Sequence, residues 1–134
     1  MQENEIAQII VQTVFDLHKS IEPGLLESVY KNSLAYDIRE KGLIVETEVP
    51  IPFIYKEVKQ DVGFRLDLLV EKKVILEIKA QELLAPVHYA QFLTYLKLIN
   101  LKLGLLINFN VALIKENLFS YYYQSYSHNQ EVHI

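Results

Sequence analysis

Hydrophobic positions recur at helical spacing in three parts of the chain. Residues 5–20 place apolar side chains three and four positions apart, which predicts an amphipathic helix. A second helix is predicted from about 25 to 41, with Gly42 as its C-terminal stop. A third opens at Pro86 in PVHYAQFLTYLKLIN, because proline is favoured in the first turn of a helix.

Between and after these helices the pattern changes to short extended runs. The segment LIVETEVPIPFIYK reads as one strand or as two joined at Pro50 and Pro52, and its prolines favour a sheet edge. VGFRLDLLV and VILEIKA predict two strands around the turn EKK, and LKLGLLINFN predicts a buried strand. LFSYYYQSY fits a last strand or a helix, and the tail from about 125 is expected to fray. The order ααβββαβ predicts one α/β domain over 1–134, with a central sheet flanked by helices.

Composition and charge narrow the class of protein. The 134 residues, 51% hydrophobic and 22% charged, are typical of one globular domain. A net charge of −4 gives no support for tight non-specific binding to nucleic acid, so a polyanion would need a local patch or a bridging cation. The absence of cysteine excludes disulfides and thiolate sites, and it suits a cytoplasmic location. We expect neither a signal peptide, given the start MQENEIAQII, nor a membrane span.

The hairpin from 64 to 80, FRLDLLVEKKVILEIKA, carries charges where core strands should be apolar. Side chains alternate between the two faces of a strand, so Glu77 and Lys79 share one face of the second strand. In the first strand, Arg65 and Asp67 share a face with Leu69. The opposite face of the first strand is then expected to carry Phe64, Leu66, Leu68 and Val70.

With EKK as the turn, Asp67 is expected to face Glu77 directly, and Arg65 to face Lys79. Like charges placed so are destabilising on their own, and a cation must neutralise them. Arg65, Lys79 and a divalent metal are all candidates, since carboxylates with water are ligands that magnesium accepts. A partly buried salt-bridge cluster at a strand end explains the spacing equally well.

Two further motifs flank this hairpin. EPGLLESVYKNSL contains Gly24, Glu27 and Tyr30 as G-x-x-E-x-x-Y, and AQFLTYLKL contains Gln91 and Tyr95 as Q-x-x-x-Y. With these motifs in order around the hairpin, the chain resembles the GxxExxY family, a branch of the PD-(D/E)XK nuclease superfamily. The resemblance covers most of the chain and implies a restriction-endonuclease-like core, in which a mixed central sheet is flanked by helices.

The resemblance also assigns the residues of an active site. It implies Asp67, Glu77 and Glu27 as metal ligands and as catalytic residues, with Lys79 as the catalytic lysine. The segment RLD lacks the proline that precedes the aspartate in the family's half-motif. A solvated helix glutamate is the alternative interpretation of Glu27.

Three residues of the third helix complete the expected site. Gln91 and Tyr95 are one turn apart and share a helix face with His88. The resemblance implies that they position the substrate near the metal. For Tyr95, ordinary packing of the helix against the sheet is an equally good interpretation.

The implied function is that of a metal-dependent nuclease that hydrolyses phosphodiester bonds. DNA is the expected substrate, with Mg²⁺ as the cofactor and Mn²⁺ as its substitute, and homo-oligomers remain open. The alternative is a catalytically inactive nuclease-fold domain that binds nucleic acid or protein. A third interpretation, a purely structural cluster, predicts that metal leaves the stability of the protein unchanged.

Overall fold

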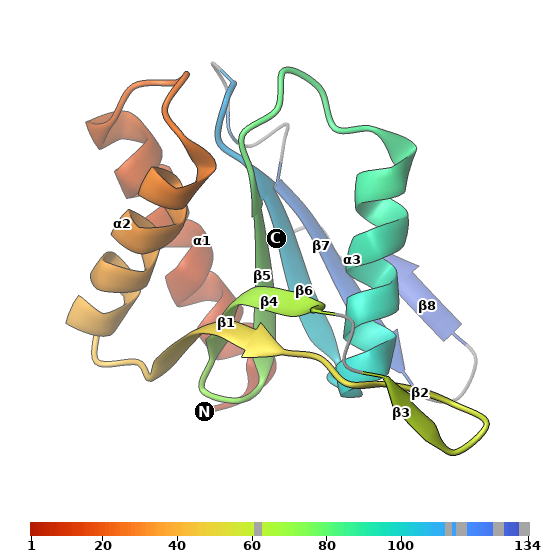
Figure 1. Cartoon of the computed structure of the whole chain (residues 1–134). Coiled ribbons are helices and arrows are strands. Elements are labelled where there is room, and N and C mark those ends of the chain that lie inside the picture. Colours follow the sequence, from red (N-terminus) through yellow and green to blue (C-terminus); the bar gives the residue numbers. More distant parts are fainter. Residues whose placement is uncertain (61–62, 112–113, 115–117, 125–127, 132–134) are drawn as a thin grey trace.

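A six-stranded mixed sheet with helices on both faces forms the centre of the computed structural model of the protein (Figure 1). The structure describes residues 1–60, 63–111, 114, 118–124 and 128–131. The elements are α1 (Glu3–Ser20), α2 (Glu27–Glu40), β1 (Val45–Pro50), β2 (Phe53–Tyr55), β3 (Val58–Gln60), β4 (Arg65–Val70), β5 (Val74–Lys79), α3 (Pro86–Ile99), β6 (Leu103–Asn108), β7 (Leu118–Gln124) and β8 (His128–Glu131).

The strands of the sheet are arranged in the order β1-β4-β5-β6-β7-β8. Neighbouring strands are antiparallel except for β5 and β6, which are parallel. A parallel pair needs a crossover connection, and α3 provides it between the end of β5 and the start of β6. β1 lies at the edge of the sheet, as its prolines predicted. Among the described helices, none is long and apolar enough to cross a membrane.

The predicted order ααβββαβ is confirmed by α1, α2, β1, β4, β5, α3 and β6. The alternative of two strands joined at Pro50 and Pro52 is correct, because β1 ends at Pro50 and β2 begins at Phe53. The structure adds β3, which pairs with β2 in a separate two-stranded hairpin (Figure 1). Lys56 and Glu57, at its turn, have φ angles of +48° and +67°, which match the twist of a two-residue hairpin turn. The segment LFSYYYQSY forms β7 up to Gln124, so the strand interpretation is correct there.

The single domain over 1–134 remains a prediction. The expected fraying from about 125 falls partly on residues 125–127 and 132–134, which lie outside the described residues. Residues 128–131, between them, form the strand β8, which pairs with β7.

Two buried hydrophobic clusters cover the two faces of the sheet. One joins α1 and α2 to the sheet through residues such as Ile10, Leu34 and Leu76. The other joins α3 to the opposite face through residues such as Phe92 and Leu106. Burial of apolar surface on both faces contributes about 25 cal/mol per Å², and it encloses the central strands β5 and β6.

The expected alternation along β4 fails at Leu66. Leu68 and Val70 pack in the cluster of α1 and α2, as one shared face requires. Leu66 instead packs in the α3 cluster, together with Leu69. The change falls at Asp67, where β4 leaves its regular pairing with β5.

Gly104 tests the packing between β6 and α3. A Cβ atom at this position would lie 2.7 Å from Cζ of Phe92 and 2.9 Å from Cγ1 of Ile75. A glycine to alanine change that fits its site stabilises a protein by about 0.4–1 kcal/mol through the unfolded state, whereas overpacking costs about 1–3 kcal/mol. We therefore expect Gly104→Ala to lower the free energy of unfolding, measured by urea denaturation.

Phe92→Leu provides the control for this clash, because it removes the ring atoms that the new methyl group would meet. In a Phe92→Leu background, Gly104→Ala should cost clearly less than it does in the wild type. An equal cost in both backgrounds would place the clash elsewhere.

Candidate active site

Two carboxylates meet where the pairing of β4 with β5 ends. The last paired residues are Leu68 and Leu76, and the next facing positions are Asp67 and Glu77. The Asp67 backbone N–H donates to Oε1 of Glu77 at 3.2 Å, and the Ile78 N–H donates to Oδ2 of Asp67 at 2.7 Å. The predicted register and the close approach of the two side chains are both found. The carboxylates bond to backbone donors of the facing strand at the point where the regular pairing stops.

Burial dominates the electrostatics of this pair. Glu77 is only 4% exposed, and burial followed by the charge of Asp67 raises its pKa to about 9. Burial also raises the pKa of Asp67, against the Ile78 N–H and nearby lysines that favour its ionised form. A side-chain hydrogen bond joins the two carboxyl groups. Because the pKa of Glu77 is raised to about 9, the metal-free pair retains a proton at neutral pH.

Lys79 is the cation that the hairpin itself brings to this pair. It follows Glu77 by two positions on β5, is partly buried, and lowers the pKa of both Asp67 and Glu77 through its charge. Arg65 does not face Lys79 as expected, because the pairing of β4 with β5 stops before it. Arg65 is exposed and pairs with Pro50 of β1 instead. Of Arg65 and Lys79, it is Lys79 whose charge lowers the pKa of both carboxyl groups.

The G-x-x-E-x-x-Y motif places Glu27 as the first residue of α2. Gly24 has a φ angle of +88°, a conformation that glycine adopts at no steric cost. The buried Tyr30 hydroxyl donates to the Glu22 carbonyl at 2.6 Å and accepts from the Leu25 N–H at 3.1 Å. Glycine and tyrosine thus shape the loop that leads into the helix, and the glutamate between them lies at its start.

An aromatic stack connects this motif to the end of β5. The rings of Tyr30 and Phe109 are stacked, with centroids 4.9 Å apart and planes 6° from parallel. The Phe109 N–H donates to the Lys79 carbonyl at 2.9 Å. Asn108 beside it bonds through its side-chain amide to the N–H and carbonyl of Gln81, each at 2.9 Å. Phe109 therefore contacts both α2, through Tyr30, and the end of β5, through Lys79.

Glu27 lies within electrostatic reach of the hairpin pair. Burial raises the pKa of its carboxyl group, the charge of Lys79 lowers it, and the charge of Asp67 raises it again. The residue is nevertheless exposed overall, at the mouth of the site. The structure brings Glu27 toward Asp67 and Lys79, and its role as a metal ligand stays a prediction.

The three residues of α3 are arranged in two different ways. Nε2 of Gln91 donates to the Tyr95 hydroxyl at 2.9 Å. Burial and the charge of Glu77 raise the pKa of Tyr95, so this hydroxyl is close to the carboxylates. Nδ1 of His88 accepts from the Ala85 N–H at 2.9 Å and caps the start of the helix. His88 thus has a structural contact of its own, and the substrate-positioning role of all three residues stays a prediction.

Lys31 and Glu48 also lie within electrostatic reach of Asp67, although the sequence did not predict them as site residues. Lys31 lies one helical turn after Glu27 and forms an ion pair with Glu48 of β1. Glu48 faces Asp67, since its neighbours in β1 pair with the neighbours of Asp67 in β4. The only sequence signal was the four-residue spacing of Glu27 and Lys31, which is also the spacing of ordinary surface ion pairs.

The donor atoms of the site suit a hard divalent cation. Asp67 and Glu77 supply adjoining carboxylate oxygens, which are ligands that Mg²⁺ accepts together with water. The pair retains a proton because too little positive charge surrounds it. Glu27 and Glu48 are further carboxylates whose charges interact with Asp67. Within the described part of the chain, no three His, Asp or Glu side chains are already arranged to hold a metal. The residues fit a cation held by two carboxylates and completed by water.

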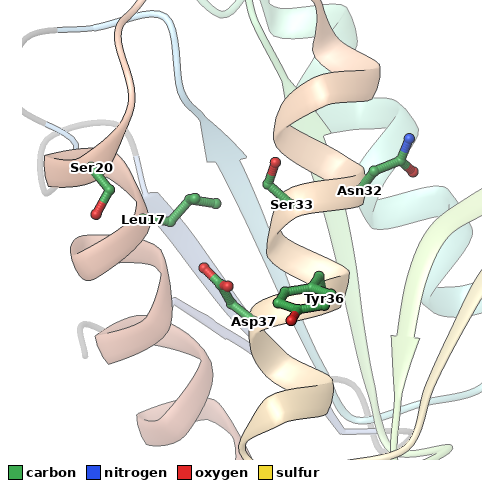
Figure 2. Close-up of a pocket in the computed structure, with 6 residues that line it drawn as sticks. All are labelled: Leu17, Ser20, Asn32, Ser33, Tyr36 and Asp37. Carbon is green, nitrogen blue, oxygen red and sulfur yellow. The ribbon is translucent and has the colours of Figure 1, made fainter.

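The pocket between α1 and α2 lies away from these residues. It has a volume of about 550 Å³, and Figure 2 shows side chains of both helices around it. None of the predicted site residues contributes to its walls, which are formed by Leu17, Ser20, Asn32, Ser33, Tyr36 and Asp37. It provides no support for a second catalytic centre.

Comparison with known proteins assigns the class of the protein. The family model of the PD-(D/E)XK nuclease superfamily matches residues 4–119, which include Asp67, Glu77, Lys79 and Glu27. The chain therefore belongs to the PD-(D/E)XK nuclease superfamily, in agreement with its mixed sheet and flanking helices. No curated protein and no solved structure gave a significant match.

The raised pKa of Glu77 predicts how stability depends on pH. The folded protein binds a proton that the unfolded chain releases, so its free energy of unfolding should fall as pH rises from about 4.5 to about 9. Glu77→Gln keeps the shape and the acceptor oxygen but cannot ionise. This variant should lose much of the pH dependence and exceed the wild type in stability at the upper end of the window. Urea denaturation in metal-free buffer at both ends of the window measures this effect.

Glu40→Gln is the matched control, because Glu40 is an exposed residue at the end of α2. It should follow the wild type at every pH. A Glu77→Gln variant with the same pH dependence as the wild type would show that Glu77 is not a buried, protonated carboxyl group.

Proposed function

We propose that the protein is a metal-dependent nuclease that hydrolyses phosphodiester bonds, with DNA as its substrate. The observation that carries this proposal is the contact between partly buried Asp67 and buried Glu77, with Lys79 beside them on β5. The chain belongs to the PD-(D/E)XK nuclease superfamily, and this set is the one that the sequence resemblance implies for its active site. A structural cluster alone offers no reason to keep two carboxylates in contact.

Asp67 and Glu77 would hold a Mg²⁺ or Mn²⁺ ion, with Glu27 as a further ligand at the mouth of the site. The ion would neutralise charge on the phosphate group and activate a water molecule. Binding requires both carboxylates to be ionised, so Glu77 must release the proton that burial keeps on it. A cation at this position also explains how an acidic chain with a net charge of −4 can approach a polyanion.

Lys79 is proposed to act on the attacking water and on the developing negative charge. Its ammonium is compact, partly buried and within electrostatic reach of Asp67, Glu77 and Glu27. A fixed positive charge at this point stabilises an oxyanion more effectively than it would in bulk water. Tyr95 and Gln91 are proposed to orient the substrate through their joined hydroxyl and amide, together with His88.

We further place the chain in the GxxExxY branch of the superfamily, on the strength of Gly24, Glu27 and Tyr30 and the contacts that they make. The assignment to DNA rather than RNA, and to the cytoplasm, forms part of the same proposal.

Metal binding should be visible as a change in stability. A ligand that binds only the folded state stabilises it by about 2.7 kcal/mol at a hundredfold excess over its Kd. MgCl2 or MnCl2 should therefore raise the melting temperature of the wild type, whereas Asp67→Asn should abolish this response. Asp67→Asn should also stabilise the metal-free protein, because it removes a carboxylate whose charge burial disfavours.

Asp37→Asn is the matched control for this experiment, because Asp37 lines the pocket between α1 and α2 instead of the proposed site. It should keep the full response to metal. If Asp67→Asn responds to metal as strongly as the wild type does, the ion binds elsewhere.

Cleavage itself is tested with labelled single- and double-stranded DNA and RNA, with Mg²⁺, with Mn²⁺ and with EDTA. We expect cleavage of DNA in the presence of metal only. Lys79→Ala should keep folding and metal-dependent stabilisation but reduce the cleavage rate by about 10²–10³-fold, the typical cost of removing one group that stabilises the transition state. Lys79→Arg should restore little activity, since a guanidinium group is broad, planar and differently hydrated.

Two results would contradict this mechanism in different ways. A wild type that binds metal but cuts none of the four substrates would support the alternative, a catalytically inactive binding domain. A Lys79→Ala variant that cuts at the wild-type rate would show that Lys79 is structural, even if the protein is a nuclease.

A further inference from the structure

The site contains a cation from α2 that has no part in the proposed chemistry. Lys31 lies one turn after Glu27, so both side chains leave the same face of the helix. The Lys31 ammonium is paired with Glu48 of β1, and the lysine side chain is only 18% exposed. Glu48 in turn faces Asp67 across the pairing of β1 with β4. The Lys31 ammonium is therefore paired with the residue opposite Asp67, and Lys31 itself lies one helical turn after Glu27.

Glu48 has a backbone conformation that side-chain-bearing residues seldom adopt within a strand. Its φ angle is +52°, although Thr47 and Val49 on either side of it pair regularly with β4. Such a conformation costs about 1–3 kcal/mol unless the surroundings compensate for it. The ion pair with Lys31 is the contact that the strained residue makes.

The charges around Lys31 are those of the proposed site. The carboxylates that favour its charged form are Glu48 first, then Asp67 and Glu27. In the other direction, the Lys31 charge stabilises ionised Asp67 more strongly than the Lys79 charge does. Without a metal, Lys31 thus supplies positive charge to two of the carboxylates that a divalent cation would use.

We propose that Lys31 is an internal counter-cation of the metal site. Its ammonium is held to one side by Glu48, and a divalent cation must compete with it for the carboxylates. This inference rests on the proposed metal-dependent function and adds a residue that sets the affinity for the cation. Like charges repel, so an ammonium close to Asp67 and Glu27 lowers the affinity of the site for a second positive ion. Glu48 limits this effect by accepting the ammonium itself.

The proposal predicts opposite effects for the two partners of the ion pair. Lys31→Met keeps the length of the side chain but removes its charge, and it should tighten Mn²⁺ binding by about tenfold. Glu48→Gln releases the ammonium toward Asp67, and it should weaken Mn²⁺ binding by a similar factor. In the Lys31→Met background, Glu48→Gln should change the Kd by a clearly smaller factor. Calorimetric titration with MnCl2 at constant ionic strength measures all four proteins.

Two further variants separate this role from a purely structural one. Lys31→Arg keeps the positive charge and should restore a Kd close to that of the wild type. Lys72→Met removes the same charge from the ion pair between Lys72 and Glu46, which involves the same strand. The Lys72 side chain is 80% exposed, so solvent screens it and the Kd should stay unchanged. Lys31→Gln replaces Lys31→Met if the latter fails to fold.

The outcomes distinguish this inference from the proposed function. If the wild type binds Mn²⁺ and Lys31→Met binds it equally or more weakly, Lys31 is not a competing cation, although the metal site stands. If tightening also occurs in Lys72→Met, the effect reports net charge and the inference is wrong. If neither the wild type nor any variant takes up Mn²⁺, the metal-dependent function fails together with the inference.

Discussion

Two carboxylates in contact with each other, Glu77 buried and Asp67 partly buried, impose the strongest constraint on this molecule. Asp67 and Glu77 lie between two hydrophobic clusters, where an uncompensated charge costs several kcal/mol. Backbone N–H groups of the facing strand, one retained proton and the charge of Lys79 compensate for this cost. Each of these contributions depends on the β4–β5 pairing stopping at the right residue. The geometry of the hairpin and the ionisation of the site are therefore inseparable.

The motif G-x-x-E-x-x-Y combines residues of two kinds. Gly24 and Tyr30 act on the backbone, one through its φ angle and the other through two hydrogen bonds of its hydroxyl group. Glu27 is the residue whose charge meets the site. A spacing of three residues places Glu27 and Tyr30 about one turn apart. The ring can therefore be buried against Phe109 while the carboxylate stays at the mouth of the site.

Much of the fold and of the carboxylate pair could be predicted from the sequence, since both depend on local periodicity. Helical spacing and buried apolar runs gave three helices and the strands between them, and the turn EKK defined the register of Asp67 and Glu77. One of the two interpretations of LIVETEVPIPFIYK included β2, but its partner β3 was missed, because the turn between them uses Lys56 and Glu57 instead of glycine or asparagine. The contact of Lys31 with Glu48 depends on a rare φ angle, which no spacing reveals.

The stack of Tyr30 on Phe109 links the first motif of the proposed site to a residue late in the chain. Every residue proposed to act on the substrate precedes Phe109, which joins Tyr30 on one side and the Lys79 carbonyl on the other. During synthesis, these residues leave the ribosome before β6 can pair in parallel with β5. The nascent chain thus carries all its reactive groups while they are still unassembled. The long-range pairing of β6, the strand that follows α3, with β5 is therefore the step that completes the proposed site.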